Sequence, residues 1–213
     1  MTKRYLQSSI FIFFILLCLA FSTYSAQAAT LAAPPQIPSF FSFEKSVFNG
    51  MASQVRGVYI PDLFALPIEQ QPAGSPLFVS QQPGVLTDFK SIHNEGSVGL
   101  LAHNYLAGRD FASIRPNQEA ILIYGDGHVE NFIVTRIYRF QALSPNSTKS
   151  DFIDLETGAK LSSDQVYAKV YTGPRHLTFQ TCIYQQKDPS WGRLFVIAEP
   201  YNPIGRANMS WYR

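Results

Sequence analysis

The amino-acid sequence predicts an all-β domain, a closed barrel or a sandwich, with one or two short helices. Short apolar runs recur along the chain after residue 55, and Pro, Gly or Gln-rich breaks separate them. Helical periodicity is weak along the same stretch. About eight short strands with regular breaks are typical of a barrel or a sandwich.

The strands expected from these apolar runs are, in chain order, Gly57–Ile60, Leu63–Ile68, Leu77–Val79, Val98–Ala102, Ala120–Tyr124, Val129–Phe140, Val166–Tyr171, Leu177–Thr181 and Leu194–Ala198. A hairpin is expected at Gly125–His128, because its Gly-Asp-Gly residues tolerate positive φ. Phe40–Ser53 and Tyr105–Ser113 are expected to hold short helical turns, and Ser162–Gln165 to open another.

The N-terminal 28 residues have the features of a secretory signal. Lys3 and Arg4 precede the uncharged apolar stretch Ser9–Phe21, and Ala26-Gln27-Ala28 offers small residues for cleavage. The stretch is short for a spanning helix, which needs about 20 residues. A cleaved signal peptide is favoured over a retained N-terminal membrane anchor. In either case the protein is exported.

We divide the chain into four parts. They are the leader (1–28), an Ala/Pro-rich linker with a short helix (29–54), the main domain (55–200) and a C-terminal tail (201–213). The chain has 17 Lys and Arg against 15 Asp and Glu. This near balance argues against a nucleic-acid partner, which needs a concentrated basic face. No metal or other cofactor is expected. Asp151, Asp154 and Glu156 are close in sequence, but solvated loop residues are the favoured interpretation.

The most informative residue is Cys182, the one cysteine that remains when the leader is set aside. It ends the strand-like run that starts at His176. If this run forms a hairpin with Leu194–Ala198, closed by a loop over residues 183–192, Cys182 and Arg193 are directly opposed. A cation beside a thiol favours the reactive thiolate, and it can stabilise the oxyanion of acyl transfer.

Such a reaction also needs a general acid, and the chain has four histidines. His176 is about 20 Å from Cys182 along the strand at 3.3 Å per residue. His128 lies at a hairpin tip and His93 in a polar stretch, so both are expected to be solvated. His103 follows directly on an apolar strand, where scaffolds present catalytic groups. We therefore select His103.

These residues resemble those of sortases. That family carries a Thr-Leu-x-Thr-Cys motif, which corresponds here to Thr178-Phe179-Gln180-Thr181-Cys182. Its arginine opens a Gly-Arg-Leu-x-Val-x-Ala-like run, here Gly192 to Ala198, and its histidine ends an apolar strand, here Leu100 to Asn104. Ala102 replaces the usual glycine and Phe179 the usual leucine. The resemblance covers roughly residues 55–199.

The resemblance implies a closed eight-stranded sortase-type β-barrel and a cysteine transpeptidase that needs no cofactor. Cys182 is then the nucleophile, His103 the acid and base, and Arg193 the group that holds the substrate and the oxyanion. Thr181 is then a substrate-binding residue. The implied partners are surface proteins bearing a sorting signal, and an amine of the cell envelope or a pilin lysine as acceptor. The enzyme then works at the cell surface, with membrane contact through its N-terminal segment as an alternative to release.

Two other interpretations remain open. A different secreted cysteine enzyme is one, including a peptidase in which water resolves the acyl enzyme. The other is a non-catalytic β-barrel binding module at the cell surface, in which Cys182 is merely buried.

Overall fold

The computed structural model describes residues 36–203, and all of them except Gln36 belong to one compact unit that starts at Ile37. Ten strands form one mixed sheet. They are β1 (Val55–Ile60), β2 (Phe64–Gln70), β3 (Leu86–Asp88), β4 (Val98–Leu101), β5 (Glu119–Tyr124), β6 (Val129–Ala142), β7 (Phe152–Asp154), β8 (Lys160–Leu161), β9 (Leu177–Gln185) and β10 (Asp188–Pro200).

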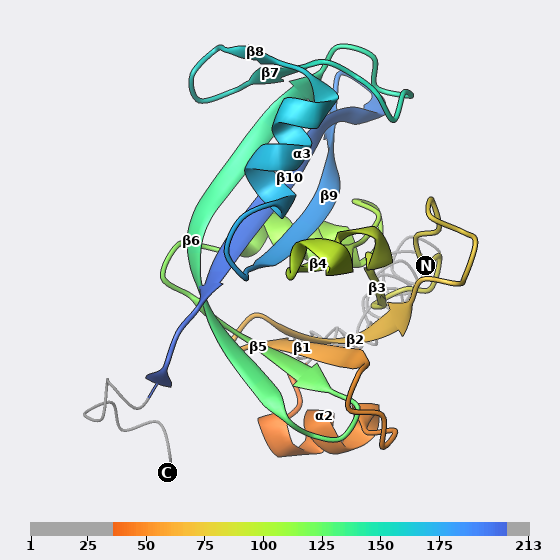
Figure 1. Cartoon of the computed structure of the whole chain (residues 1–213), viewed down its shortest axis with the longest axis vertical. Coiled ribbons are helices and arrows are strands. Elements are labelled where there is room, and N and C mark those ends of the chain that lie inside the picture. Colours follow the sequence, from red (N-terminus) through yellow and green to blue (C-terminus); the bar gives the residue numbers. More distant parts are fainter. Residues whose placement is uncertain (1–35, 204–213) are drawn as a thin grey trace, which may run out of the picture. The chain divides into compact units, whose positions relative to one another are not determined.

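The sheet closes into a barrel because β10 pairs with both β9 and β6. The strand order β10-β9-β4-β3-β2-β1-β5-β6 forms the ring, and β7 and β8 extend from β6 outside it (Figure 1). Ten strands less these two leave eight in the barrel. The predicted all-β class and the closed eight-stranded barrel are therefore confirmed.

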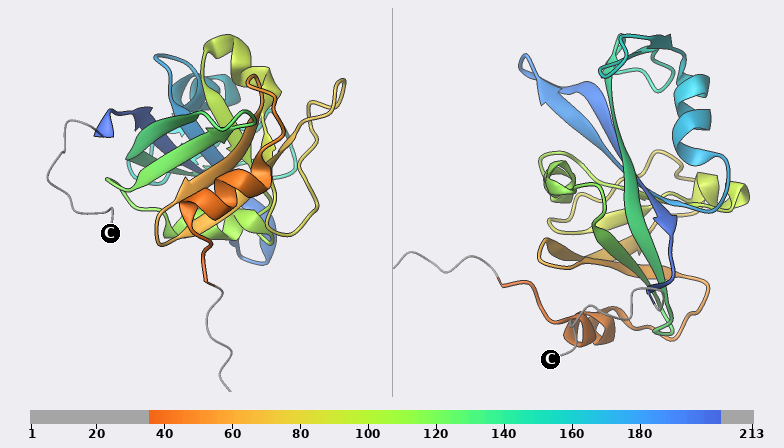
Figure 2. Two further views of the ribbon diagram at one scale, coloured as in Figure 1. Left: turned by 90° about the horizontal axis from the view of Figure 1, so that it is seen from below. Right: turned by 90° about the vertical axis from the view of Figure 1, so that its left-hand side faces the viewer.

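Within residues 36–203, four short helices accompany the barrel. They are α2 (Phe40–Val47), the 3₁₀ helices η1 (Lys90–Glu95) and η2 (Ala107–Ser113), and α3 (Ser163–Tyr171). The Ser39 side chain caps α2 by accepting from Ser42 N–H. Phe43 and Val47 of α2 are buried against the sheet together with Ile123 of β5, and two further views show α2 beside the barrel (Figure 2).

The prediction of a strand at residues 166–171 is wrong, because these residues form most of α3. Ser162 and Gln165 form a complete capping box, which satisfies backbone N–H groups at the helix start. Val166 and Val170, four residues apart, are both buried, which is helical spacing. The sequence pattern located the start of this helix but assigned its body to a strand.

Residues 77–79 are not a strand either. The buried Gln71 side chain donates to the carbonyls of Pro76 and Phe78 and so holds this segment in an irregular loop. The short strands β3, β7 and β8, of two or three residues each, were not predicted. Such strands are too short to show a period in the sequence.

Two hydrophobic cores lie on opposite faces of β9 and β10. Leu177 and Phe179 of β9 point into the barrel interior, where they are fully buried. Phe195 and Ile197 of β10 point outward and pack against α3, which lies along these strands in Figure 1. The predicted alternation of side chains between two faces is therefore present in both strands. Along the first half of β9, both faces of the strand are buried.

The hairpin of β9 and β10 is longer than predicted. The loop expected over residues 183–192 is wrong, since β9 continues to Gln185 and β10 begins at Asp188. The pairing shifts register between Asp188 and Gly192. Figure 2 shows this hairpin projecting beyond the end of β4.

The leader, the linker up to residue 35 and the tail from residue 204 lie outside the described residues. Within residues 36–203, no helix has the length and hydropathy needed to cross a bilayer.

Candidate active site

The site is built on β9, which carries Cys182 and has a different neighbour on each side. On one side β9 pairs with β4 in parallel register, so that Leu100 stands beside Phe179 and Leu101 beside Gln180. Both pairs are 79 residues apart in the sequence. Counted two residues past the end of β4, the same offset relates His103 to Cys182. Neighbouring strands are about 4.8 Å apart.

On the other side β9 pairs with β10 in antiparallel register, and Arg193 is the direct partner of Cys182. The spacing argument from the sequence therefore gave the correct pair, although it placed the pair wrongly at the loop. The backbone carbonyl of Gln180 points toward β4 and accepts a hydrogen bond from the Ala102 N–H. The N–H and C=O groups of every second residue point to the same side of a strand, so those of Cys182 also point toward β4. Because they point away from β10, Cys182 and Arg193 form a non-hydrogen-bonded pair. The Cα atoms of such pairs are about 4.5 Å apart and their side chains are close.

The segment that carries His103 is fastened to β9 by Thr181. The Thr181 hydroxyl is buried and donates to the Ala102 carbonyl at 2.8 Å. The His103 carbonyl accepts from the backbone N–H of Leu106 and of Gly108. Thr181, expected from the resemblance to bind substrate, therefore makes a contact that positions the histidine.

Gly108 at the start of η2 is needed for this close packing. A Cβ atom at residue 108 would lie 2.7 Å from the Ala102 carbonyl oxygen and 2.8 Å from that of His103. Both distances are too short for backbone atoms that cannot move aside. The turn after His103 is thus defined by main-chain contacts on two sides.

The His103 imidazole has two side-chain neighbours. Gln81 Nε2 lies 2.7 Å from His103 Nε2, and the Tyr105 hydroxyl donates to Gln81 Oε1 at 3.1 Å. The Tyr105 ring stacks on the imidazole with ring centroids 5.1 Å apart. With its oxygen occupied by Tyr105, the Gln81 amide donates to Nε2, so the neutral imidazole carries its proton on Nδ1.

The Arg193 guanidinium is half-buried and bound to three main-chain carbonyls. Nη1 donates to Ser190 and Gly192 at 2.8 and 2.9 Å, and Nη2 donates to Pro145 in the loop after β6 at 3.1 Å. Arg193 lies inside β10 and not at the start of that strand. Its positive charge is therefore fixed by the backbone of two chain segments, at residues 190–192 and at Pro145.

Cys182 is partly exposed, as is Gln180 before it on the same face, whereas Thr178 is buried. Thr178 is fully buried and donates to the Val170 carbonyl of α3, and the Tyr171 hydroxyl donates to Gln180. The helix α3 thus covers β9 as far as Gln180.

The other three histidines have partners elsewhere. His93 lies 2.8 Å from the buried carboxylate of Asp88, and this hydrogen bond raises the pKa of His93. His128 bonds Asp126 in the β5–β6 hairpin loop, and His176 is buried against the Val170 carbonyl and Ser97. None of these contacts includes Cys182.

Among residues 36–203, no three His, Cys, Asp or Glu side chains gather in a way that could hold a metal ion. Asp151 pairs with Lys160 at 2.9 Å. Asp154 is buried and accepts from the backbone N–H of Glu156, so its carboxylate organises a turn. The structure thus gives Asp151 and Asp154 individual roles within the β7–β8 region.

Gln81 and Tyr105 were not found from the sequence. Gln81 lies in the irregular segment between β2 and β3, and 22 residues separate it from His103. This segment is held by Ser80 N–H, which donates to the Thr87 hydroxyl at 2.8 Å. No motif or periodicity marks such a contact. Tyr105 was assigned only to a helical turn.

No protein-family model matches the sequence, and a comparison with curated protein sequences also finds no match. Solved structures with a similar backbone include sortase A of Listeria monocytogenes, with 12% identity, a TM-score of 0.46, and coverage of 72% of this chain and 89% of that one. A sortase D5 transpeptidase of Clostridium perfringens has 11% identity, a TM-score of 0.45, and coverage of 78% and 90%.

A third similar structure is sortase C of Clostridium perfringens with the C-terminal cell wall sorting motif. It has 16% identity, a TM-score of 0.43, and coverage of 80% of this chain and 79% of that one.

Proposed function

We propose that this protein is a sortase-like cysteine transpeptidase, which cleaves a peptide bond in a sorting signal and transfers the acyl part to an amine. The observation that carries the proposal is the register at β9: one neighbouring strand leads to His103 and the other carries Arg193 opposite Cys182. These three groups have complementary chemistry, come from distant parts of the sequence, and are each partly exposed.

In the first half of the reaction, the Cys182 thiolate attacks the scissile carbonyl carbon. A C–S bond forms, and the carbonyl oxygen takes the negative charge. Arg193, the antiparallel partner of Cys182, stabilises this oxyanion. The C–N bond then breaks, and the leaving amine takes a proton from the imidazolium form of His103, which leaves a thioacyl enzyme.

In the second half, an acceptor amine attacks the thioester carbonyl. His103, now neutral, accepts a proton from that amine, and the C–S bond breaks to return the Cys182 thiolate. The product contains a new amide bond. If water attacks instead, the same steps give peptide hydrolysis.

The proposed substrates are surface proteins with a sorting signal, and the proposed acceptor is an amine of the cell envelope or a lysine of a pilin subunit. The proposed location is the outer surface of the cell, either released or held through the N-terminal segment. These assignments follow from the resemblance of the sequence around His103, Cys182 and Arg193 to sortases.

The test is a library of quenched five-residue peptides incubated with the full chain carrying Cys18→Ser, with and without an amine nucleophile. We expect cleavage of a subset of peptides, a thioacyl adduct on Cys182 by mass spectrometry, and a ligated product when the amine is present. The matched control is Cys182→Ser. Turnover that persists in this variant would remove Cys182 from the mechanism.

Arg193→Lys separates the charge from the geometry of the arginine. Lysine keeps the positive charge but lacks the planar fork that binds three carbonyls here. We expect kcat to fall by roughly 10²-fold, as is typical when one oxyanion donor is lost. An unchanged kcat would assign Arg193 a structural role only.

A further inference from the structure

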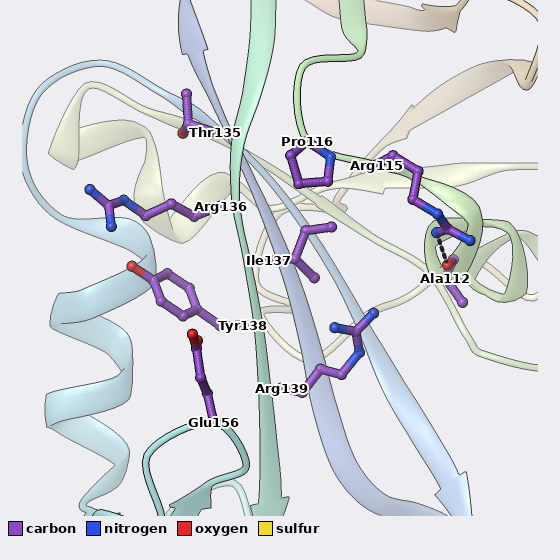
Figure 3. A pocket seen from close by; sticks show the side chains of 9 residues that line it. All are labelled: Ala112, Arg115, Pro116, Thr135, Arg136, Ile137, Tyr138, Arg139 and Glu156. Carbon is purple, nitrogen blue, oxygen red and sulfur yellow. Dashed lines mark hydrogen bonds between the residues drawn. The ribbon is translucent and has the colours of Figure 1, made fainter.

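A pocket of about 550 Å³ lies beside the middle of β6, where Arg136, Ile137, Tyr138 and Arg139 form one wall. The wall opposite is formed by the segment after η2, which contributes Arg115. Figure 3 shows Ile137 and Arg139 on one side of the β6 ribbon and Arg136 and Tyr138 on the other. The pocket therefore follows the edge of the strand and reaches both of its faces.

This edge of β6 has no neighbouring strand. On the N-terminal side of the pocket, the backbone of Val134 forms hydrogen bonds with Asn117 and Gln118. On its C-terminal side, the Arg139 carbonyl accepts a hydrogen bond from the Leu155 N–H. Between these points β6 pairs only with β10. Because backbone groups alternate along a strand, Ile137 N–H, the Ile137 carbonyl and Arg139 N–H point into the pocket. No hydrogen bond to these three groups is found among residues 36–203.

The charges around this edge are strongly unequal. Three arginines and one carboxylate, Glu156, line the pocket, which leaves a surplus of two positive charges (3 − 1 = 2). Arg115 is held in place by donating to the carbonyls of Ala112 and Ile114. None of the ion pairs among the described residues involves Arg115, Arg136 or Arg139.

We propose that this pocket binds a short extended segment of an acidic peptide, which pairs with the free edge of β6. A peptide residue opposite Ile137 has both the carbonyl and the N–H that match the unpaired backbone groups, as in other cases of strand addition. Side chains of an extended peptide alternate between two faces. Carboxylates on one face meet Arg115 and Arg139, and those on the other meet Arg136.

A simple anion would match the arginines but not the Ile137 carbonyl, which needs a donor. An uncharged strand would match the backbone but leave the surplus charge unused. An acidic peptide satisfies both requirements, and bidentate Arg–carboxylate contacts are among the strongest hydrogen bonds in proteins. The proposal does not depend on the reaction proposed for Cys182.

The test measures the fluorescence anisotropy of a labelled peptide, Glu-Asp-Val-Glu-Asp amide, with the full chain at low salt. Two peptide controls separate the contributions. Gln-Asn-Val-Gln-Asn removes the charges, and N-methylation of the central valine removes a backbone donor while keeping the charges. We expect at least tenfold weaker binding for the first control and at least fivefold weaker binding for the second.

On the protein side, Arg136→Ala combined with Arg139→Ala should weaken binding of the acidic peptide at least tenfold. Arg109→Ala is the matched control, because its exposed arginine in η2 lies outside the pocket and should leave binding unchanged. Thermal melting of each variant verifies that it remains folded.

Three outcomes would overturn the proposal. Equal binding of the charged and uncharged peptides would show that the arginines do not select carboxylates. An N-methylated peptide that binds as well as the parent, and that inorganic phosphate displaces, would indicate a plain anion site. Equal loss in the Arg109→Ala variant would indicate non-specific attraction to the protein surface.

Discussion

The outward face of β9 and β10 has two halves, one in contact with the helix α3 and one without such contacts. In one half, Thr178 and Gln180 of β9 and Phe195 of β10 contact the last two residues of α3, Val170 and Tyr171. In the other half, Arg193 bonds the backbone of Ser190, Gly192 and Pro145, none of which belongs to α3, and Cys182 is partly exposed.

The two halves share the same strands, the same register and the same alternation of side chains. They differ in their contacts with α3, whose last two residues, Val170 and Tyr171, bond Thr178 and Gln180. The covered half contributes buried apolar area and fixes the register, and the open half uses that register to bring reactive groups together. Stability and chemistry are thus assigned to neighbouring residues of one face. Substitutions on the two sides of this boundary should have opposite signatures.

The largest expected effect is on the open half. His103→Ala removes the proposed acid and base, so cleavage of a matching peptide should become undetectable, while the melting temperature changes little. The measurement is turnover of the peptide, paired with thermal unfolding. Retained turnover would exclude His103 from the mechanism. His128→Ala, in the β5–β6 hairpin loop, serves as the control.

The next effect is on the covered half. Phe195→Ala removes a ring that is 4% exposed and packs edge-on against Phe140 and Tyr171. We expect a loss of about 3–5 kcal/mol in the free energy of unfolding. Tyr184→Ala is the comparison, since this ring lies past Cys182 on the same face and is 63% exposed. Its cost should be within about 0.5 kcal/mol. Equal costs in chemical denaturation would contradict the boundary.

A smaller effect is expected from Gln81→Leu, which removes the hydrogen bond to His103 but keeps the side-chain size. The imidazole should lose its preferred tautomer and orientation, with about a tenfold loss in kcat, by analogy with other general acid–base contacts. Nitrogen NMR of His103 gives a readout apart from turnover: the Nδ1–H form should dominate in the parent and not in the variant. An unchanged tautomer ratio would argue against a positioning role for Gln81.

The sequence predicted the pair Cys182 and Arg193 because both strands show clear alternation and a hairpin is antiparallel. It placed the turn wrongly for a physical reason. The turn is formed by Gln186 and Lys187, both with positive φ (52° and 65°), whereas such turns usually contain Asn or Gly. Backbone pairing in the exposed half of the hairpin needs no apolar side chains, so the largely polar residues 183–192 were assigned to a loop.

The contacts that position His103 could not be predicted in the same way. Thr181 lies in the motif, but its partner is the Ala102 carbonyl on another strand. Gln81 acts from an irregular loop whose path depends on the packing of Gln71 and Ser80. Neither contact leaves a periodic signal. The sequence therefore indicated that His103 ends an apolar strand, but it did not indicate its contacts with Gln81 and Tyr105.

The smallest effect lies outside both halves, at His93 and Asp88. The hydrogen bond to the Asp88 carboxylate raises the pKa of His93 in the folded state. A raised pKa of a base means that its stabilising contribution is fully present below the unfolded value of about 6.5 and is lost as pH rises through the folded value. His93→Gln should therefore destabilise the protein more at pH 5.5 than at pH 9, as measured by urea denaturation at the two pH values. A pH-independent difference would contradict this assignment.

The most direct test of the site is a disulfide between positions 103 and 182. Counted past the end of β4, the parallel register relates residue 103 to residue 182, and a disulfide needs Cα atoms about 4.4–6.8 Å apart. In the full chain with Cys18→Ser, His103→Cys should oxidise to an intramolecular disulfide with Cys182, whereas His176→Cys should not, since residue 176 lies six residues away along the chain. Two free thiols in the His103→Cys variant after oxidation would contradict the convergence on which the proposed mechanism depends.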